Sequence, residues 1–244
     1  MVKIRIENLS RSFEENKVLD DFNLDINEGE ILCILGKSGT GKSVILKHLV
    51  GIFKSDSGKI FVDGQEFVPD SRESFSKIIS KYGILFQNGA LFDSMNVYDN
   101  VAFGLRRLKL SEKEIEERVN ESLANVGLAG KGELFPSELS AGMQKRAALA
   151  RSIAVRPEIM LYDEPTTGVD PITAGAIDRL IVKMRDIYKI TSVVVTHDVR
   201  SAFRIADRIA VLNQGKVVYC ASPLEIEQSS DTFVRDFVQR RLKK

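Results

Sequence analysis

The sequence predicts an α/β fold in which buried strands end in a phosphate-binding loop and in acidic residues. Residues 36–43 read GKSGTGKS and match the phosphate-loop pattern G-x-x-x-x-G-K-[ST] at every fixed position. The apolar run 31–35 precedes this loop as a buried strand would, and a helical pattern follows it. A further apolar run, 159–162, ends at Asp163 and Glu164, where ligands bind in open α/β sheets.

The residue types of the loop suit the binding of a triphosphate. Glycines let main-chain N–H groups approach phosphate without a Cβ atom in the way, and the following helix adds its positive dipole end. Lys42 brings a positive charge to the outer phosphates, and the Ser43 hydroxyl suits Mg²⁺. The alternative is a glycine-rich turn without a ligand. The predicted nucleotide-binding residues of the loop are Gly36, Lys37, Ser38, Gly39, Thr40, Gly41, Lys42 and Ser43.

Composition narrows the class of protein. The 244-residue chain carries 35 basic and 34 acidic side chains, so its overall charge does not favour a nucleic-acid partner. No apolar run approaches the ~18–20 residues that span a bilayer, and the alternating first ten residues are typical of a strand, not of a signal peptide. Cys33 and Cys220 lie in apolar runs and are expected to be reduced core residues. We expect a single domain over residues 1–244.

The N-terminal region is expected to form antiparallel strands. Val2, Ile4 and Ile6 alternate with charged residues, and residues 22–26 alternate in the same way before a turn into the phosphate-loop strand. Phe13 lies in the polar stretch RSFEEN, which we interpret as a turn. Its ring has two interpretations, local packing or stacking on a nucleobase.

Residues 82–86 form a third apolar strand, and Gln87 follows it directly. A neutral amide at a strand end can ligate Mg²⁺ and water beside a nucleotide, although by itself Gln87 is only a loop residue. Residues 87–105 are apolar and aromatic but broken by Gly, Asn, Asp and Ser. They predict either an ordinary subdomain core or a surface that faces a partner.

Two helix starts follow. Ser111 and Glu114 form a capping box for a helix over 111–126. Ser140 caps a second helix, and the small residues after it would leave the N-terminus open to an anion. As a lone pattern this is an ordinary N-cap.

Two acids and a histidine complete the predicted site. Asp163 can hold Mg²⁺, directly or through water, and Glu164 can take a proton from an attacking water. Metal binding and catalysis explain these acids better than packing, because unpaired charge is costly to bury. The strand 191–196 ends at His197, which is either a structural residue or a group that reaches the γ-phosphate or the nucleophilic water.

The C-terminal part is expected to contain a hairpin over 209–219 and a short helix with a capping box at Ser222. We expect a helical extension over about 222–244, docked on protein, with membrane-surface binding as the alternative. Truncation after Gln228 should then weaken assembly and spare catalysis. Its apolar residues at helical spacing are Phe233, Val234, Phe237 and Val238.

The order of these motifs resembles that of the ATP-binding-cassette (ABC) transporter ATPases. The phosphate loop, Gln87, LSAGM at 139–143, LYDEP at 161–165 and THD at 196–198 follow one another over essentially the whole chain. The resemblance implies an ABC-type core of the P-loop NTPase fold, with an inserted helical subdomain at about 88–156 and an N-terminal antiparallel β region. It implies ATP and Mg²⁺ as cofactors.

The resemblance also assigns roles to matching residues. It implies that Phe13 stacks on adenine, that Gln87 senses Mg²⁺ and the membrane partner, and that Asp163 supports the metal. Glu164 matches the general base and His197 the switch histidine. The implied catalytic set is Lys42, Gln87, Glu164 and His197, and the implied metal set is Ser43, Gln87 and Asp163.

In this family ATP is bound between two chains. Ser140, Ala141, Gly142 and Met143 match the segment that grips the γ-phosphate of ATP on a second copy, and Asp170 matches the loop that crosses between subunits. A head-to-tail dimer of this chain is therefore expected. Ala141 departs from the usual glycine, and its methyl group fits only if the residue is in the right-handed helical region.

Four longer segments resemble a narrower group, the Mla or organic-solvent-tolerance ATPases. These segments are 36–48, 88–103, 136–154 and 161–173. That group works beside a membrane permease and an Mce-class lipid-binding protein, which implies phospholipid movement between bacterial membranes. The implied place is the cytoplasmic face of the inner membrane, with the permease contacted through about 87–105 and a small regulatory subunit as a further partner.

Two alternatives remain open from the sequence. An importer ATPase for another cargo, such as an amino acid or an ion, would carry the same motifs, because the permease chooses the cargo. A regulator or nucleic-acid-linked ABC protein is the second alternative, although the balanced charge and the lack of an added domain count against it.

Overall fold

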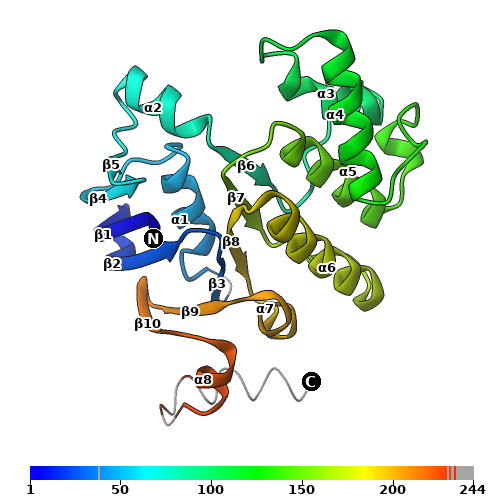
Figure 1. Ribbon diagram of the computed structural model, residues 1–244. Helices are drawn as coiled ribbons and strands as arrows, with labels where there is room; N and C mark the ends of the chain where they lie inside the picture. The colour runs from blue at the N-terminus through cyan, green and yellow to red at the C-terminus, as the bar shows by residue number, and fades with distance from the viewer. Residues whose placement is uncertain (38, 230, 232–233, 235–244) are drawn as a thin grey trace.

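The computed structural model describes residues 1–37, 39–229, 231 and 234 and contains two sheets (Figure 1). The strands are β1 (Val2–Phe13), β2 (Asn16–Asn27), β3 (Ile31–Gly36), β4 (Ser57–Val62), β5 (Gln65–Glu66), β6 (Tyr82–Leu85), β7 (Ile159–Asp163), β8 (Thr191–Thr196), β9 (Arg208–Asn213) and β10 (Lys216–Ala221). The helices are α1 (Lys42–Leu49), α2 (Arg72–Ile79), α3 (Val97–Leu105), α4 (Glu112–Asn125), α5 (Ala141–Ala154), α6 (Pro171–Tyr188), α7 (Val199–Ile205) and α8 (Pro223–Glu227).

The larger sheet has the strand order β10-β9-β3-β8-β7-β6, and its strands from β9 to β6 are parallel. Strands β3 and β8 are buried along their whole length, as continuous apolar runs require when both faces of a sheet are covered. The register pairs Leu35 with Thr196, Val195 with Asp163, and Tyr162 with Leu85. The carboxyl ends of these four strands therefore lie side by side.

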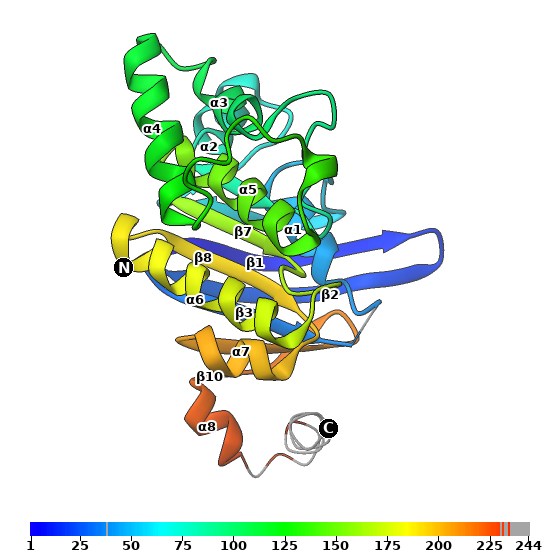
Figure 2. The same cartoon turned by 90° about the vertical axis from the view of Figure 1, so that its right-hand side faces the viewer.

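Two separate cores cover the two faces of this sheet. One core contains α1 together with the smaller antiparallel sheet, whose order is β2-β1-β4-β5. The other contains α3 to α7. Side chains of β3 alternate between them, with Cys33 in the second core and Leu32 and Ile34 in the first. Figure 2 shows α6 and α7 on one side of the large sheet and the β1–β2 pair on the other.

The predicted antiparallel region is confirmed, with one local correction. Phe13 is the last residue of β1 and pairs with Asn16, so it does not lie in the turn. The strands are long because pairing continues to the very end of the hairpin. Glu14, in the left-handed region at φ 54°, reverses the chain there.

The helical part contains α3, which the broken pattern of 87–105 concealed. Asn96 caps this helix, and its side chain accepts from the N–H of Asp99. Asn100 is fully buried and bonds both backbone groups of Phe92, with distances of 2.8 and 3.1 Å. The polar residues that interrupt the apolar pattern are therefore a cap and a buried link, not breaks in structure.

The remaining predictions for helices and strands have mixed outcomes. The capping boxes at Ser111 and Ser222, the β9–β10 hairpin and the strand 191–196 are confirmed. Helices α2, α6 and α7 were not predicted. The C-terminal repeat of Phe233, Val234, Phe237 and Val238 lies outside the described residues, apart from Val234, which is buried. No helix within the described ranges is long and apolar enough to cross a membrane.

The cap of α4 yields a test of local stability. The Ser111 hydroxyl accepts from the N–H of Glu114, and the Glu114 carboxylate accepts from the N–H of Ser111 at 2.8 Å. Ser111→Ala should lower the free energy of unfolding by about 1 kcal/mol, and the matched Ser111→Gly by only about a few tenths. Denaturant unfolding measures both. Equal losses would show that the capping hydroxyl is not what stabilises this helix start.

Candidate functional site

The phosphate loop connects β3 to α1 and is shaped by glycines. Gly39 and Gly41 have φ of 81° and 96°, which side chains with a Cβ atom rarely adopt. A Cβ atom on Gly36 would lie 2.7 Å from Thr40 Oγ1, and one on Gly41 would lie 2.9 Å from a backbone oxygen. The backbone of the loop is therefore closely fitted to its neighbours. Ser38 lies outside the described residues.

Lys42 holds its charge inside this loop. Its ammonium donates to the carbonyl oxygens of Gly36 at 3.0 Å and Lys37 at 2.9 Å, and it lies 3.6 Å from Glu164 Oε1. The side chain is only 6 % exposed. A buried ammonium is stable only with such partners, so the loop and the carboxylate of β7 hold the cation where phosphate would reach it.

Ser43 and Asp163 bring two hard oxygen atoms together. The Ser43 hydroxyl donates to Asp163 Oδ1 at 3.0 Å, from the first turn of α1 to the end of β7. Burial raises the pKa of Asp163, and the nearby Glu164 charge raises it further, while the Ser43 hydrogen bond opposes the shift. Hydroxyl and carboxylate oxygens are ligands that Mg²⁺ prefers, so these two residues fit a nucleotide-bound magnesium ion. Among the described residues, no group of three or more His, Cys, Asp or Glu is arranged so that it could hold a metal ion.

Glu164 is held in an unusual backbone conformation. Its φ is 48°, in the left-handed region, and this costs about 1–2 kcal/mol for a residue with a Cβ atom. The Glu164 N–H donates to the carbonyl of Val195 on β8 at 2.9 Å, which fixes the turn. The adjacent strand thus stabilises a strained position, as is often found where a side chain must point at a ligand.

One carboxylate oxygen of Glu164 collects several donors. His197 Nδ1 lies 2.7 Å from Oε2, within hydrogen-bond distance, and the His197 backbone N–H donates to the same oxygen at 3.3 Å. The hydroxyls of Thr167 and Thr196 donate to the same oxygen at 3.2 and 3.4 Å. Sequence reasoning missed these two threonines, although each lies within three residues of a predicted site residue.

A buried lysine from α5 supports the same turn. Lys145 is 7 % exposed, and its ammonium donates to the carbonyl of Pro165 at 2.9 Å. Burial lowers the pKa of Lys145, and the Glu164 charge acts in the opposite direction. The helix that begins at Ser140 is thereby tied to the residue that follows Glu164. The sequence offered no signal for this contact, because Lys145 looks like a solvated helix residue.

The segment 140–143 begins α5 and belongs to the opposite face of the sheet from α1. Ser140 is the N-cap and, like Ala141, is exposed. Ala141 is the first helical residue, so its methyl group is tolerated. Gly142 packs against α6, where an added Cβ atom would lie 2.5 Å from Thr173 Cγ2. In Figure 1, α1 and α5 lie on opposite sides of β7. Segment 140–143 therefore does not lie beside the phosphate loop of the same chain.

Two other predicted residues lie near this arrangement. Asp170 caps α6 and accepts from the N–H groups of Ile172 and Thr173, both at 3.0 Å. The hydrogen bond from the Thr173 hydroxyl, followed by these backbone bonds, lowers the pKa of Asp170. Gln87 is exposed two residues beyond β6, at the same sheet edge as Asp163 and Glu164. The structure thus brings Lys42, Ser43, Asp163, Glu164, His197 and the Gln87 segment to one edge.

Phe13 lies at the tip of the β1–β2 hairpin, not on this edge. Its ring is half-buried and packs against Phe53, with ring centroids 5.3 Å apart. Both interpretations of Phe13 therefore remain compatible with its position, since part of the ring is packed and part is exposed.

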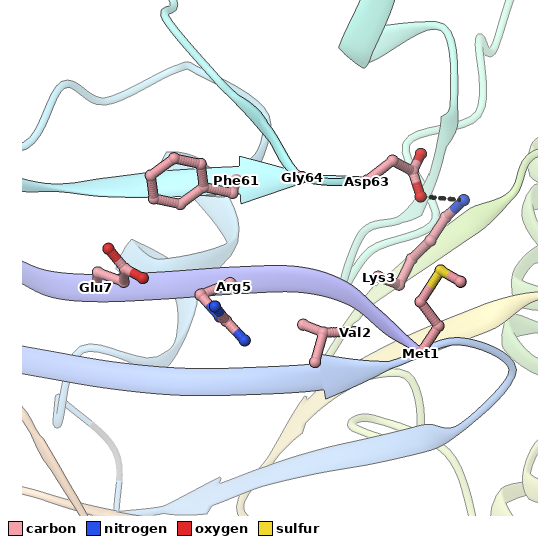
Figure 3. Close-up of a pocket in the computed structure, with 8 residues that line it drawn as sticks. All are labelled: Met1, Val2, Lys3, Arg5, Glu7, Phe61, Asp63 and Gly64. Carbon is pink, nitrogen blue, oxygen red and sulfur yellow. Dashed lines mark ion pairs between the residues drawn. The ribbon is translucent and has the colours of Figure 1, made fainter.

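The structure contains a cavity beside the candidate site and another over the N-terminal strands. One of about 540 Å³ lies beside His197 and is lined by residues of the 166–171 loop and of α7. The other, of about 620 Å³, lies over β1 and β4, where Figure 3 shows Lys3 and Asp63 paired across it. Three of its charged residues already form ion pairs, Lys3 with Asp63 at 2.8 Å and Arg5 with Asp25 at 3.0 Å. The cavity beside His197 is the one that belongs to the candidate site.

Comparison with protein families matches residues 19–167 to the ABC transporter model. The "Probable ribonucleotide transport ATP-binding protein mkl" of Mycobacterium leprae is 40 % identical over 98 % of this chain and 70 % of its own length. The "Intermembrane phospholipid transport system ATP-binding protein MlaF" of Haemophilus influenzae is 39 % identical over 97 % of this chain and 90 % of its own length. A sulfate/thiosulfate import ATP-binding protein CysA of Bacillus cereus is 38 % identical over 97 % of this chain and 66 % of its own.

Solved structures show the same fold. cbiO1 from Clostridium perfringens, part of the ABC transporter complex cbiONQ, superposes with a TM-score of 0.87 at 31 % identity, covering 99 % of this chain and 94 % of that protein. The ATP-binding cassette MJ0796, as a dimer bound to ADP and Pi, superposes with a TM-score of 0.80 at 32 % identity, covering 90 % of this chain and 98 % of that one. These likenesses confirm the predicted fold class.

The raised pKa of Asp163 predicts a stability cost in the nucleotide-free protein. Its folded pKa exceeds the unfolded one, so between the two values the folded state binds more protons and stability falls as pH rises. Asp163→Asn keeps an acceptor for Ser43 and removes the charge, so it should raise Tm at neutral pH. The gain should shrink as pH falls to the ordinary aspartate range.

Melting curves of both proteins from about pH 4 to pH 8 measure this difference. An Asp163→Asn variant that is less stable than the wild type at neutral pH would contradict the assigned cost of the buried charge.

Proposed function

The chain belongs to the ABC transporter ATPases, and we propose that the ATP it hydrolyses drives the movement of phospholipid between bacterial membranes. The observation that carries this cargo is the segment 88–103, whose Gly89–Ser94 part resembles that of the phospholipid-transport ATPases. The likeness to MlaF extends over 97 % of this chain, so it includes this segment.

The proposed permease contact is the surface formed by residues of about 87–105, with Phe86 and Leu108 at its borders. Phe86, Phe92 and Leu108 are each about 40 % exposed. The rings of Phe92 and Phe103 lie 4.7 Å apart, and the guanidinium of Arg151 lies 5.6 Å from the Phe92 ring. Aromatic side chains with arginine are typical of the centres of protein interfaces. This supports a partner-facing surface here, with an Mce-type lipid-binding protein and a small regulatory subunit as further proposed partners.

We assign the chemistry to the residues at the carboxyl edge of the sheet. Glu164 is proposed as the general base, because its carboxylate is held by His197 and the two threonines and one of its oxygens faces Lys42. Lys42 would leave the loop carbonyls for the phosphate oxygens. His197, half-exposed beside Glu164, would contact the γ-phosphate or the attacking water through its other nitrogen.

Magnesium would be held by Ser43 and Asp163, with Gln87 near the same edge, and would supply positive charge to the phosphates. Ser43 and Asp163 are already in contact, so little rearrangement is needed. The glycines of the loop allow its N–H groups to approach the phosphates.

We propose that two copies of the chain enclose each ATP. Segment 140–143 lies on the opposite face of the sheet from its own loop, while Ser140 and Ala141 are exposed at a helix N-terminus. A head-to-tail pair would bring that N-terminus to the loop of the second copy. The dimeric state of the related cassette supports this arrangement. The pair would be bound to the permease at the cytoplasmic face of the inner membrane.

A second candidate keeps the ATPase and changes the cargo. The relatives named for ribonucleotide transport and for sulfate/thiosulfate import are 40 % and 38 % identical to this chain, against 39 % for MlaF. Because the cargo contacts the permease, the ATPase chain can be alike in all of them.

The general-base role predicts the behaviour of Glu164→Gln. Loss of a general base should reduce ATP hydrolysis about 100-fold or more, while ATP still binds and ATP-bound dimers accumulate. Phosphate release and size-exclusion chromatography measure the two effects. Glu121→Gln, on α4 and paired with Arg156, is the matched control and should hydrolyse ATP normally. A Glu164→Gln protein with undiminished turnover would refute the assignment.

The cargo is tested on the complex purified with its permease. Phospholipid should co-purify with the complex, and in reconstituted vesicles it should stimulate hydrolysis. Stimulation by an amino acid, a ribonucleotide or sulfate, with no response to phospholipid, would replace the first candidate by the second.

A further inference from the structure

The ring of Phe13 is held in place by residues from two other segments, and we propose that Phe53 and Arg11 are positioning residues that set the affinity for the base of the nucleotide. This inference rests on the proposed ATPase function and on the role that the family resemblance implies for Phe13, stacking on the base. It goes beyond that function because neither positioning residue belongs to a nucleotide motif. Both lie on the Phe13 side of the molecule, away from the catalytic edge.

Phe53 supports Phe13 from the side. The two ring centroids are 5.3 Å apart with an interplanar angle of 64°, which is the edge-to-face geometry that aromatic pairs prefer. Both rings are half-buried. A ring supported in this way has fewer orientations before a base arrives, so less rotational freedom is lost when the base stacks.

The end of α1 determines where Phe53 lies. After the helix, the N–H groups of Ile52 and Phe53 both donate to the carbonyl of Lys47, at 2.9 and 3.2 Å. Gly51 makes this turn possible with a φ of 70°, and a Cβ atom there would lie 2.9 Å from the Phe67 ring. The Phe53 ring also packs against His48 of α1, at 5.9 Å.

Helix α1 therefore connects the phosphate loop to the residue that supports the Phe13 ring. Its first turn carries Lys42 and Ser43 of the phosphate loop, and its last turn carries the contacts that hold Phe53. An eight-residue helix is a rigid rod of about 12 Å. The distance between the phosphate loop and the residue that supports the base platform is thereby fixed by a single element.

Arg11 covers a face of the Phe13 ring. Its guanidinium lies 4.9 Å from the ring centroid, within the range of a cation–π contact. Asp56 holds Arg11 with an ion pair of 2.8 Å, and its second oxygen accepts from the N–H of Ser12 at 2.6 Å. The Ser12 hydrogen bond, with that of Arg11, lowers the pKa of Asp56, so this anchor is ionised at neutral pH. The base must stack on the part of the ring that these contacts leave exposed.

The test compares ATP, which carries a nucleobase, with tripolyphosphate, which does not. Dissociation constants for ATP and for tripolyphosphate are measured by calorimetry on the full chain and on Phe53→Ala, Phe53→Leu, Arg11→Gln and Phe13→Ala. Loss of the ring pair should weaken ATP binding about two- to tenfold, and loss of the cation about two- to fivefold. Binding of tripolyphosphate should not change. Phe53→Leu keeps apolar bulk and serves if the alanine variant does not fold.

The matched control is Phe61→Leu. Phe61 is also half-buried, but it lines the cavity over β1 and β4, so its loss should leave ATP affinity unchanged. A double variant adds a further check. In the Phe13→Ala protein, Phe53→Ala should cause no additional loss, because the ring that it supports is gone.

Three results would overturn the inference: unchanged ATP affinity in both Phe53 variants, an equal loss for tripolyphosphate, or additive losses in the double variant. The proposed function fails separately, in the hydrolysis assay of Glu164→Gln. If Phe13→Ala binds ATP as tightly as the wild type, Phe13 does not stack on the base and the inference fails with it. The assignment as an ATPase would still stand.

Discussion

The structure depends on the burial of opposite charges at the carboxyl edge of a parallel sheet. The Lys42 ammonium and the Glu164 carboxylate are 3.6 Å apart and are 6 % and 12 % exposed. Charges so buried are stable only when partners surround them. The loop carbonyls surround one, and His197 with neighbouring hydroxyls surrounds the other. The order of the strands is what brings these groups together, since β3, β8 and β7 end side by side.

The same sheet separates two halves of a site. The phosphate loop and α1 belong to the core on one face, and the helix that begins at Ser140 belongs to the core on the other. Lys145 connects that helix to the carbonyl next to Glu164, so within one chain the exposed helix start and the catalytic turn are joined by a buried hydrogen bond. If ATP binds between two copies, each chain contributes its catalytic turn to one ATP and its helix start to the other. The Lys145 hydrogen bond then connects these two sites within each chain.

Much of this site could be predicted because each motif residue ends a strand or begins a helix. Local pattern therefore located Lys42, Asp163 and His197, and parallel pairing placed them together. Side chains that act across elements left no such pattern. Lys145 resembles a surface residue, and Phe53 follows a helix end with no motif. Helix α3 was obscured because its cap and its buried Asn100 read as interruptions of an apolar run.

The most direct test of a shared site mixes two inactive proteins. Lys42→Ala removes the loop cation and keeps the helix start, and Ser140→Arg blocks the helix start and keeps the loop. In a mixed dimer one composite site is intact, so hydrolysis should return when the two variants are combined. A mixture as inactive as its components, or full activity of Ser140→Arg alone, would contradict the account.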